Sequence, residues 1–105
     1  MGGAIAWLFT KANIPVRLKD LNWEAIKKGY QTAAGIYAQL KKLRKFDDRE
    51  INLRMHHLSG TTDYSGFHRS DIVVEAVVED LKVKETVIAE LEHNVRKDTI
   101  IASNT

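Results

Sequence analysis

The stretch Asp71-Ile72-Val73-Val74-Glu75-Ala76-Val77-Val78-Glu79 decides the fold of this chain. Its apolar, β-branched residues follow one another without polar alternation, which predicts a strand that is buried on both faces. Such strands are typical of parallel sheets in α/β proteins. The strand leads to two carboxylates, Glu75 and Glu79, and ligands of open α/β sheets bind beyond the carboxyl ends of the strands. We therefore expect either a ligand site at this end or the solvated charges on which many core strands end.

The segments on either side of this stretch alternate between helical and strand patterns. Helices are predicted over residues 2–12, 23–45 and 80–96, with a shorter one that begins at residue 47. Strands are predicted over residues 14–20, 71–77 and 99–102, and extended structure with turns over 55–67. This order predicts an α/β fold, a Rossmann-like parallel sheet with flanking helices, in one domain over residues 1–105.

Local signals set the ends and faces of these helices. The residues that we expect to cap helices are Asn13, Asn22 and Asp80. The side chains that we expect to face inward from the two longer helices are Ile26, Tyr30, Ala33, Tyr37 and Leu40, and then Val83, Val87, Ile88 and Leu91. Glycines at 29 and 35 either weaken the second helix or permit close helix packing.

Composition excludes several classes of function. A formal net charge of +2 gives no case for binding nucleic acid, and the absence of cysteine excludes disulfides and thiolate metal sites. The apolar runs are too short to span a membrane, and the first residues lack the basic region of a signal peptide. We expect a soluble, cytoplasmic protein without a membrane span.

The first half of the chain carries a partial dinucleotide-binding pattern. Asp20 ends the predicted strand about 20 residues after the initial glycines, where an acid can accept hydrogen bonds from the adenosine ribose. Such an acid also repels a 2′-phosphate, which favours NAD over NADP. Gly2 could be the last glycine of a G-x-G-x-x-G turn, although the first two glycines are absent. The alternative is that Asp20 simply caps the helix that follows.

Other polar clusters offer weaker signals. His56 and His57 are adjacent and would point to opposite faces of a strand, and His68 and His93 have no ligand partners at metal-site spacing. Residues 41–45, which read Lys-Lys-Leu-Arg-Lys, could bind phosphate, but we prefer a solvated helix end whose charges complement the helix dipole. No catalytic set can be assembled from these residues, and no metal site is expected.

Several segments together resemble the NAD-binding domain of the 3-hydroxyacyl-CoA dehydrogenase family. They are Met1–Ala6, Asp63–Phe67, Asp71–Glu79, Lys82–Lys84 and Ala102–Thr105. Within the family, the sequence of these segments is most similar to that of the α-subunit of the bacterial multifunctional fatty acid oxidation complex. The resemblance implies an NAD-dependent oxidoreductase that acts on fatty acyl-CoA substrates in β-oxidation, in a parent protein that forms a complex with a thiolase subunit.

The resemblance also implies which residues hold the cofactor. They are Met1, Gly2, Asp20, Val77, Val78, Glu79 and Lys84. The first two would belong to the phosphate-binding turn, and the third would bind the ribose. The next three would form a loop along the cofactor, and the last would reach it from the following helix.

The same resemblance indicates what the chain lacks. The family's first strand would precede Met1, and its catalytic His–Glu pair would follow Thr105, so we expect a partial NAD-binding domain that is inactive alone. The missing strand would leave a slot between residues 14–19 and 72–77. The slot could be closed by direct pairing of these strands or, as we favour, by a second copy of the chain in a homo-oligomer that associates through open sheet edges.

Two other functions fit the residues less closely. One is a small interaction module that binds a partner through the stripe of the second helix and binds no nucleotide. The other is the nucleotide-binding half of a different NAD-dependent dehydrogenase.

Overall fold

The computed structural model describes residues 2–77 and 80–103. The chain forms two compact units, Met1–Asp63 and Tyr64–Thr105. Within each unit, helices pack against a pair of parallel strands, which confirms the predicted α/β class with its Rossmann-like parallel pairing.

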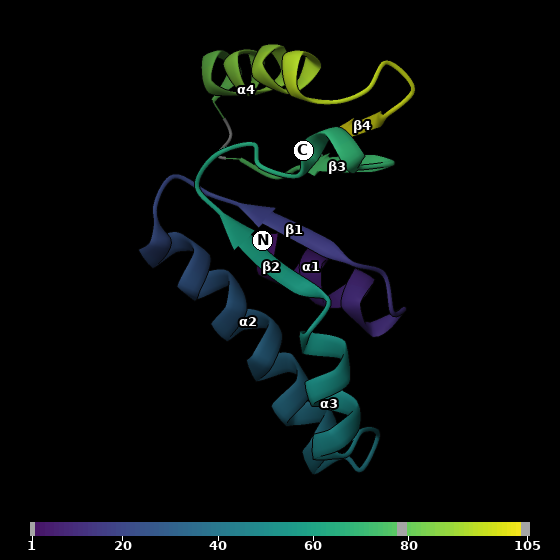
Figure 1. The fold of residues 1–105 in the computed structure, drawn as a ribbon. Coiled ribbons are helices and arrows are strands. Elements are labelled where there is room, and N and C mark those ends of the chain that lie inside the picture. The colour runs from purple at the N-terminus through teal and green to yellow at the C-terminus, as the bar shows by residue number, and fades with distance from the viewer. Residues whose placement is uncertain (1, 78–79, 104–105) are drawn as a thin grey trace. The chain divides into compact units, whose positions relative to one another are not determined.

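Three helices and two strands lie in the described part of the first unit. Their order is α1 (Gly2–Lys11), β1 (Val16–Lys19), α2 (Trp23–Lys42), α3 (Asp48–Met55) and β2 (Leu58–Thr61). The two strands run parallel, and their register places Val16 opposite Leu58 and Lys19 opposite Thr61 (Figure 1). Their carboxyl ends therefore lie at the same edge of the pair.

Side-chain caps define the starts of α2 and α3. The cap at Asn22 was predicted, whereas residue 47, predicted to begin the shorter helix, instead caps it. Asn22 accepts a hydrogen bond from the backbone N–H of Ala25 at 2.9 Å, and Asp47 forms a capping box with Glu50. The second helix ends at Lys42 rather than near residue 45, because the backbone turns into the left-handed region at φ 59° two residues later. Asn13, with φ 62°, terminates α1 in the same way.

The core of the first unit lies where α1 packs on α2. Ala6, Ala33 and Leu58 form its fully buried centre. Thr10 and Tyr37, both fully buried, share a hydrogen bond between their hydroxyl oxygens at 2.9 Å. A side chain of one helix thus satisfies the buried hydroxyl of the other, which fixes the pairing of the two helices.

Close approach of α1 and α2 depends on a glycine. A Cβ at Gly3 would lie 2.7 Å from both the Gly29 carbonyl oxygen and the Thr32 Cβ, so residue 3 has no room for a side chain. A Cβ at Gly29 would in turn lie 2.6 Å from Leu18. Gly29 therefore permits close packing. Apart from its chain neighbours and the nearby backbone of its own helix, no atom of the described residues would lie within 4 Å of a Cβ at Gly35, so Gly35 does not serve this role.

Alanine substitutions at two of these glycines should have opposite effects. Gly3→Ala is expected to lower the free energy of unfolding by about 1–3 kcal/mol, because backbone atoms of the facing helix must move. Gly35→Ala is the matched control and should raise it by about 0.5–1 kcal/mol, because the helix gains propensity and nothing is displaced. Urea denaturation measures both, and equal effects of the two substitutions would contradict the close packing described here.

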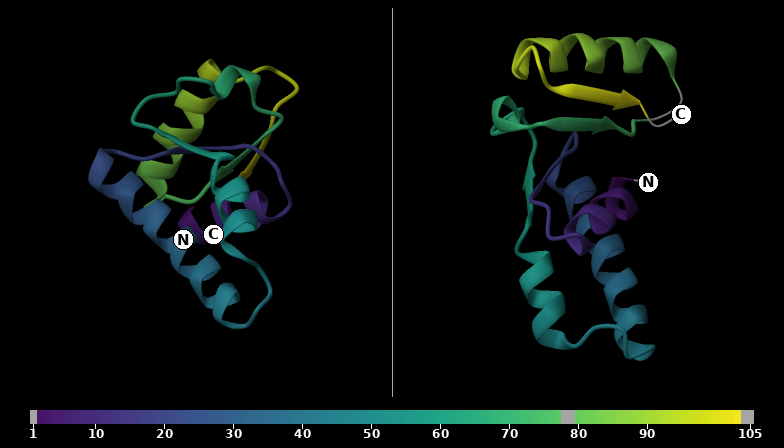
Figure 2. Two further views of the ribbon diagram at one scale, coloured as in Figure 1. Left: turned by 60° about the horizontal axis from the view of Figure 1, so that its bottom comes forward. Right: turned by 90° about the vertical axis from the view of Figure 1, so that its right-hand side faces the viewer.

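Over residues 64–77 and 80–103, the second unit has one long helix, one short helix and two strands. They are η1 (Phe67–Arg69), β3 (Ile72–Glu75), α4 (Leu81–Asn94) and β4 (Ile100–Ser103). The strands run parallel, with Ile72 opposite Ile100 and Glu75 opposite Ser103, and α4 runs alongside the pair (Figure 2). Asp80 caps α4 as predicted, since its carboxylate accepts the backbone N–H groups of Lys82 and Val83.

The inward face of α4 differs from the prediction at one position. Leu91 is buried against Phe67 and Val73, as expected. Val83, which we expected to face inward, is exposed, and Lys84 is buried in its place. Lys84 can be buried because its ammonium group lies beside the Glu75 carboxylate of β3.

In the second unit, β3 is shorter than predicted and both strands are less buried than expected. The expected strand 71–77 is ordered as β3 over four residues, and Ala76 and Val77 lie beyond its end. Ile72 is 45% exposed and Ile100 is 63% exposed, so the expectation of strands buried on both faces is wrong here. The side chains of Val73 and Glu75 face the unit's core, and those of the alternate residues do not.

Among the described residues, the ladders join β1 to β2 and β3 to β4, each within one unit. Both ways of closing the expected slot, direct pairing of residues 14–19 with 72–77 and exchange with a second copy, stay predictions.

In the described residues, no helix has both the length and the apolar character to cross a membrane.

Candidate functional site

The carboxyl edge of the first unit carries Asp20 directly after β1. The Asp20 backbone N–H donates to the Thr61 carbonyl at 3.3 Å, which continues the parallel ladder, and the half-buried carboxylate accepts the backbone N–H of Leu21 at 2.8 Å. Gly2 begins α1 beside the same strand, since a Cβ there would lie 3.7 Å from Leu18. The structure thus brings the start of α1 and the end of β1 together.

The carboxyl edge of the second unit is organised by Glu75, whose side chain is fully buried. One carboxylate oxygen accepts a hydrogen bond from the Ser103 hydroxyl at 2.8 Å, and the other accepts the Val77 backbone N–H at 2.7 Å. The Lys84 ammonium lies 3.7 Å from the first oxygen, with its side chain only 10% exposed. A buried carboxylate thus connects β3, β4, the residues after β3 and the first turn of α4.

Competing effects act on the pKa of Glu75. Burial raises the pKa of this carboxyl group, but the hydrogen bonds from Ser103 and Val77 and the positive charge of Lys84 lower it. The net result is a pKa below the ordinary value of 4.5. Glu75 is therefore a carboxylate at neutral pH, and it forms an ion pair with Lys84.

This lowered pKa predicts a pH-dependent contribution to stability. Because the folded-state pKa lies below the unfolded one, the contribution is present above the ordinary pKa and is lost as the pH falls through the folded value. The wild type should melt at a higher temperature than Glu75→Gln at pH 7, and the difference should shrink below about pH 4.5. Thermal unfolding of both proteins across this range checks it, and a difference that grows at acid pH would contradict it.

The predicted site residues fall on both edges. Gly2 and Asp20 belong to the first unit, and Val77 and Lys84 belong to the second, where Glu75 brings them together. Met1, Val78 and Glu79 lie outside the described residues.

Two residues of the second edge were not among the predicted cofactor residues. Glu75 was expected at a possible ligand site at the end of its strand, but its contact with Ser103, the opposite residue in the ladder, was not predicted. A signal was present in α4: residues 84, 87, 88 and 91 have the spacing of one helix face, and a lysine in such a stripe requires a buried partner.

Histidines do not form a site in the described part of the chain. His56, His68 and His93 are exposed and His57 is half-buried. No group of three or more His, Asp or Glu side chains that could hold a metal ion occurs among the described residues.

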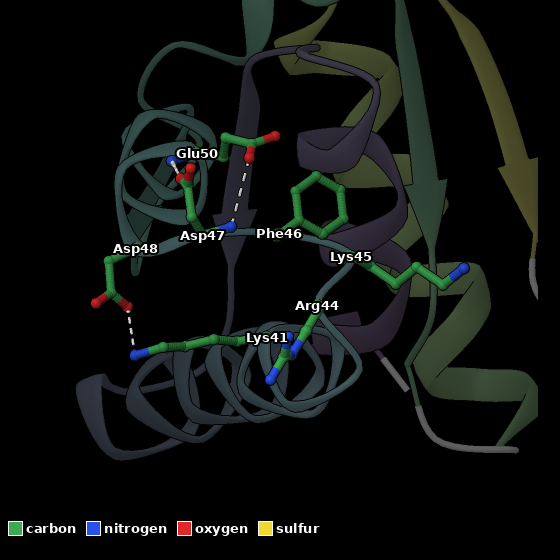
Figure 3. Close-up of a pocket in the computed structure, with 7 residues that line it drawn as sticks. All are labelled: Lys41, Arg44, Lys45, Phe46, Asp47, Asp48 and Glu50. Atoms are coloured by element: carbon green, nitrogen blue, oxygen red, sulfur yellow. Dashed lines mark hydrogen bonds and ion pairs between the residues drawn. The ribbon is translucent and has the colours of Figure 1, made fainter.

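The basic cluster of residues 41–45 lies where α2 turns toward α3. A pocket there is lined by Lys41, Arg44, Lys45, Phe46, Asp47, Asp48 and Glu50 (Figure 3). The Lys41 ammonium lies 2.8 Å from the Asp48 carboxylate, and both side chains are mostly exposed. These contacts agree with the solvated helix end that we preferred over a phosphate site.

The side chains at the carboxyl ends of the strands are typical of one class of protein. Acidic and basic side chains lie at the carboxyl ends of parallel strands, and one strand ends beside a helix that begins on glycine, as in dinucleotide-binding α/β proteins. A sequence model of the NAD-binding domain of 3-hydroxyacyl-CoA dehydrogenase matches residues 1–105, and the chain belongs to this family. NAD is the cofactor of the family's domain, which favours the dehydrogenase interpretation over the interaction module.

Solved structures agree with this assignment. The (S)-3-hydroxybutyryl-CoA dehydrogenase of Ralstonia eutropha is 30% identical with a TM-score of 0.95, and the match covers 100% of this chain and 37% of that one. The 3-hydroxybutyryl-CoA dehydrogenase of Escherichia coli is 29% identical with a TM-score of 0.87, over 100% and 22%. The dehydrogenase part of multifunctional enzyme 1 from C. elegans is 30% identical with a TM-score of 0.83, over 100% and 24%. The chain thus spans well under half the length of these proteins.

Proposed function

We propose that this chain supplies the NAD-binding part of an enzyme that oxidises 3-hydroxyacyl-CoA to 3-oxoacyl-CoA in fatty acid β-oxidation. The observation that carries the proposal is the family match over residues 1–105. Two structural neighbours are 3-hydroxybutyryl-CoA dehydrogenases, which supports the substrate class. The carboxyl edges of the two strand pairs supply side chains suited to a dinucleotide.

The proposed cofactor contacts follow the chemistry of these edges. Asp20 would accept hydrogen bonds from the adenosine ribose, and Gly2 would leave room for the phosphates at the start of α1. Lys84 would donate to the cofactor from α4, beside Val77. Met1, Val78 and Glu79 complete the proposed set.

The test is an activity assay on the complete enzyme that carries these residues. Incubation with (S)-3-hydroxybutyryl-CoA and NAD⁺ is expected to produce NADH. NADH binding without oxidation of any 3-hydroxyacyl-CoA would indicate another NAD-dependent dehydrogenase. If the enzyme does not bind NADH at all, the alternative function, an interaction module that binds no nucleotide, would be favoured.

The catalytic groups are proposed to lie outside these 105 residues. Oxidation of a hydroxyl needs a positioned base, usually histidine, and none of the four histidines follows a strand at the edge that carries Asp20 or at the edge that carries Glu75. The 105-residue chain alone is therefore expected to produce no NADH from 3-hydroxyacyl-CoA. Turnover by this chain in the same assay would show that the catalytic base lies within it.

Two further proposals concern the parent protein. The parent is proposed to be a multifunctional enzyme that is located in the cytoplasm. The multifunctional character is supported by the C. elegans neighbour, which is the dehydrogenase part of a multifunctional enzyme.

A thiolase subunit is the proposed partner, because it would consume the 3-oxoacyl-CoA product. Co-purification of the tagged parent with a thiolase would support this, and a lone parent chain would contradict it.

The 105-residue chain is also proposed to form a homo-oligomer. Each ladder in the described residues has two strands, and strands at the edge of a sheet can pair with another copy of a chain. Light scattering should report a dimer or larger species. A strict monomer would exclude this mode of association.

A further inference from the structure

Glu75 connects three segments at the carboxyl edge of the second unit. Its carboxylate is bound by Ser103 at the end of β4, by Val77 just after β3, and by Lys84 in the first turn of α4. Both oxygens take part, and the side chain is almost fully buried. A single side chain thereby fixes the positions of the residues that flank the connection from β3 to α4.

A contribution to the stability of the fold does not by itself explain the buried ion pair between Glu75 and Lys84. Burying two opposite charges costs desolvation energy that their attraction only partly returns, and apolar residues of similar size often stabilise a fold as well or better. The surroundings would suit such residues, since Val73 on the same face of β3 packs with Phe67 and Leu91. Buried ionisable groups at the carboxyl edge of a parallel pair are more typical of functional sites.

Lys84 is the residue whose position depends most on Glu75. Among the described residues it is the one lysine classed as buried, and it occupies a position in the apolar stripe of α4. Lysine side chains are long and flexible, and near a surface their charged ends turn toward water. The Glu75 carboxylate holds the ammonium at the strand edge, where ligands of α/β sheets bind.

We propose that Glu75 is a positioning residue for the cofactor, which acts by holding the Lys84 ammonium at the carboxyl edge of β3 and β4. The inference rests on the proposed function, because it requires Lys84 to contact NAD. Glu75 itself does not touch the cofactor. Its effect on binding passes through Lys84.

A double-mutant cycle on the complete enzyme tests this dependence. Dissociation constants for NADH are measured by fluorescence titration for the wild type, Glu75→Gln, Lys84→Met and the double variant. Each single substitution is expected to weaken binding by about tenfold, and the double variant should bind no more weakly than Lys84→Met, within about twofold. Glu85→Gln, which removes an exposed acid next to Lys84 on the same helix, is the matched control and should leave NADH binding unchanged.

Each alternative result has a distinct meaning. If Glu75→Gln weakens binding by the same factor with and without Lys84, Glu75 acts independently of the lysine and the proposal is overturned. If Lys84→Met weakens binding but Glu75→Gln does not, the positioning role fails while the cofactor contact stands. If Lys84→Met leaves the dissociation constant for NADH unchanged, Lys84 does not contribute to cofactor binding and the proposal is overturned. A wild type that binds no NADH would refute the proposed function itself.

A second variant covers the case in which Glu75→Gln does not fold. Ser103→Ala keeps both charges and removes the hydroxyl that orients the carboxylate. As a single substitution, Ser103→Ala should raise the dissociation constant for NADH by about threefold to fivefold. In a protein that already carries Lys84→Met, it should leave this dissociation constant unchanged. Unchanged NADH affinity of a folded Ser103→Ala protein would overturn the proposal.

Discussion

Asp20→Asn is expected to weaken NADH binding to the complete enzyme by about tenfold or more. The substitution replaces a charged acceptor of the ribose hydroxyls by a neutral amide, and hydrogen bonds to charged groups are worth roughly 1.5–3 kcal/mol. The side chain is half-buried at the end of β1, and its size is unchanged by the substitution. The loss should therefore appear in the dissociation constant, with little change in the melting temperature.

Glu24→Gln is the matched control for this prediction. It removes the same charge from an exposed position in the first turn of α2, a few residues away. NADH affinity should not change. If Asp20→Asn also leaves the affinity unchanged, Asp20 does not bind the ribose. The alternative that Asp20 caps the following helix is not supported, because Asn22 caps α2 and Asp20 accepts the backbone N–H of Leu21.

Leu91→Ala is expected to lower the free energy of unfolding by about 2–5 kcal/mol. Leu91 is 2% exposed and packs with Phe67 and Val73, so the substitution leaves a cavity in the core of the second unit. Leu81→Ala makes the same chemical change in the same helix at a residue that is 72% exposed. It should change the free energy by no more than about 0.5 kcal/mol.

Urea denaturation of these two variants separates packing from helix propensity. The two substitutions change propensity alike, because each replaces a leucine in α4. A large difference between them therefore measures burial. Equal losses would contradict the core that the structure assigns to this unit.

Local features of the fold could be predicted because their causes lie within a few residues. Asn22 and Asp80, both expected as caps, each accept a backbone N–H three residues ahead, so the signal and its effect share one short segment. The stripe of α2 was equally predictable, since helix geometry alone brings Ile26, Ala33 and Tyr37 to one face.

Features that depend on distant partners could not be predicted in this way. Hydrophobic pattern placed Val83 in the core of the second unit, but the structure buries Lys84, because the carboxylate of Glu75 in another element compensates its charge. The same limit applies to strand burial. The run from Ile72 to Val74 is apolar throughout, yet Ile72 is exposed, since what covers each face depends on tertiary packing and not on the run itself.

The candidate site shows both kinds of feature. Asp20 follows its strand directly, so its place at the carboxyl edge of β1 could be inferred from the sequence. The contacts among Glu75, Ser103 and Lys84 join three elements and became visible only in the folded chain.

Binding of NAD by these residues, as part of a 3-hydroxyacyl-CoA dehydrogenase, is tested most directly by a crystal structure of the complete enzyme with NAD⁺ bound. We predict that the adenosine ribose lies within hydrogen-bonding distance of the Asp20 carboxylate and that the Lys84 ammonium contacts the cofactor. A dinucleotide bound away from both carboxyl edges, with Asp20 and Lys84 facing solvent, would contradict this prediction.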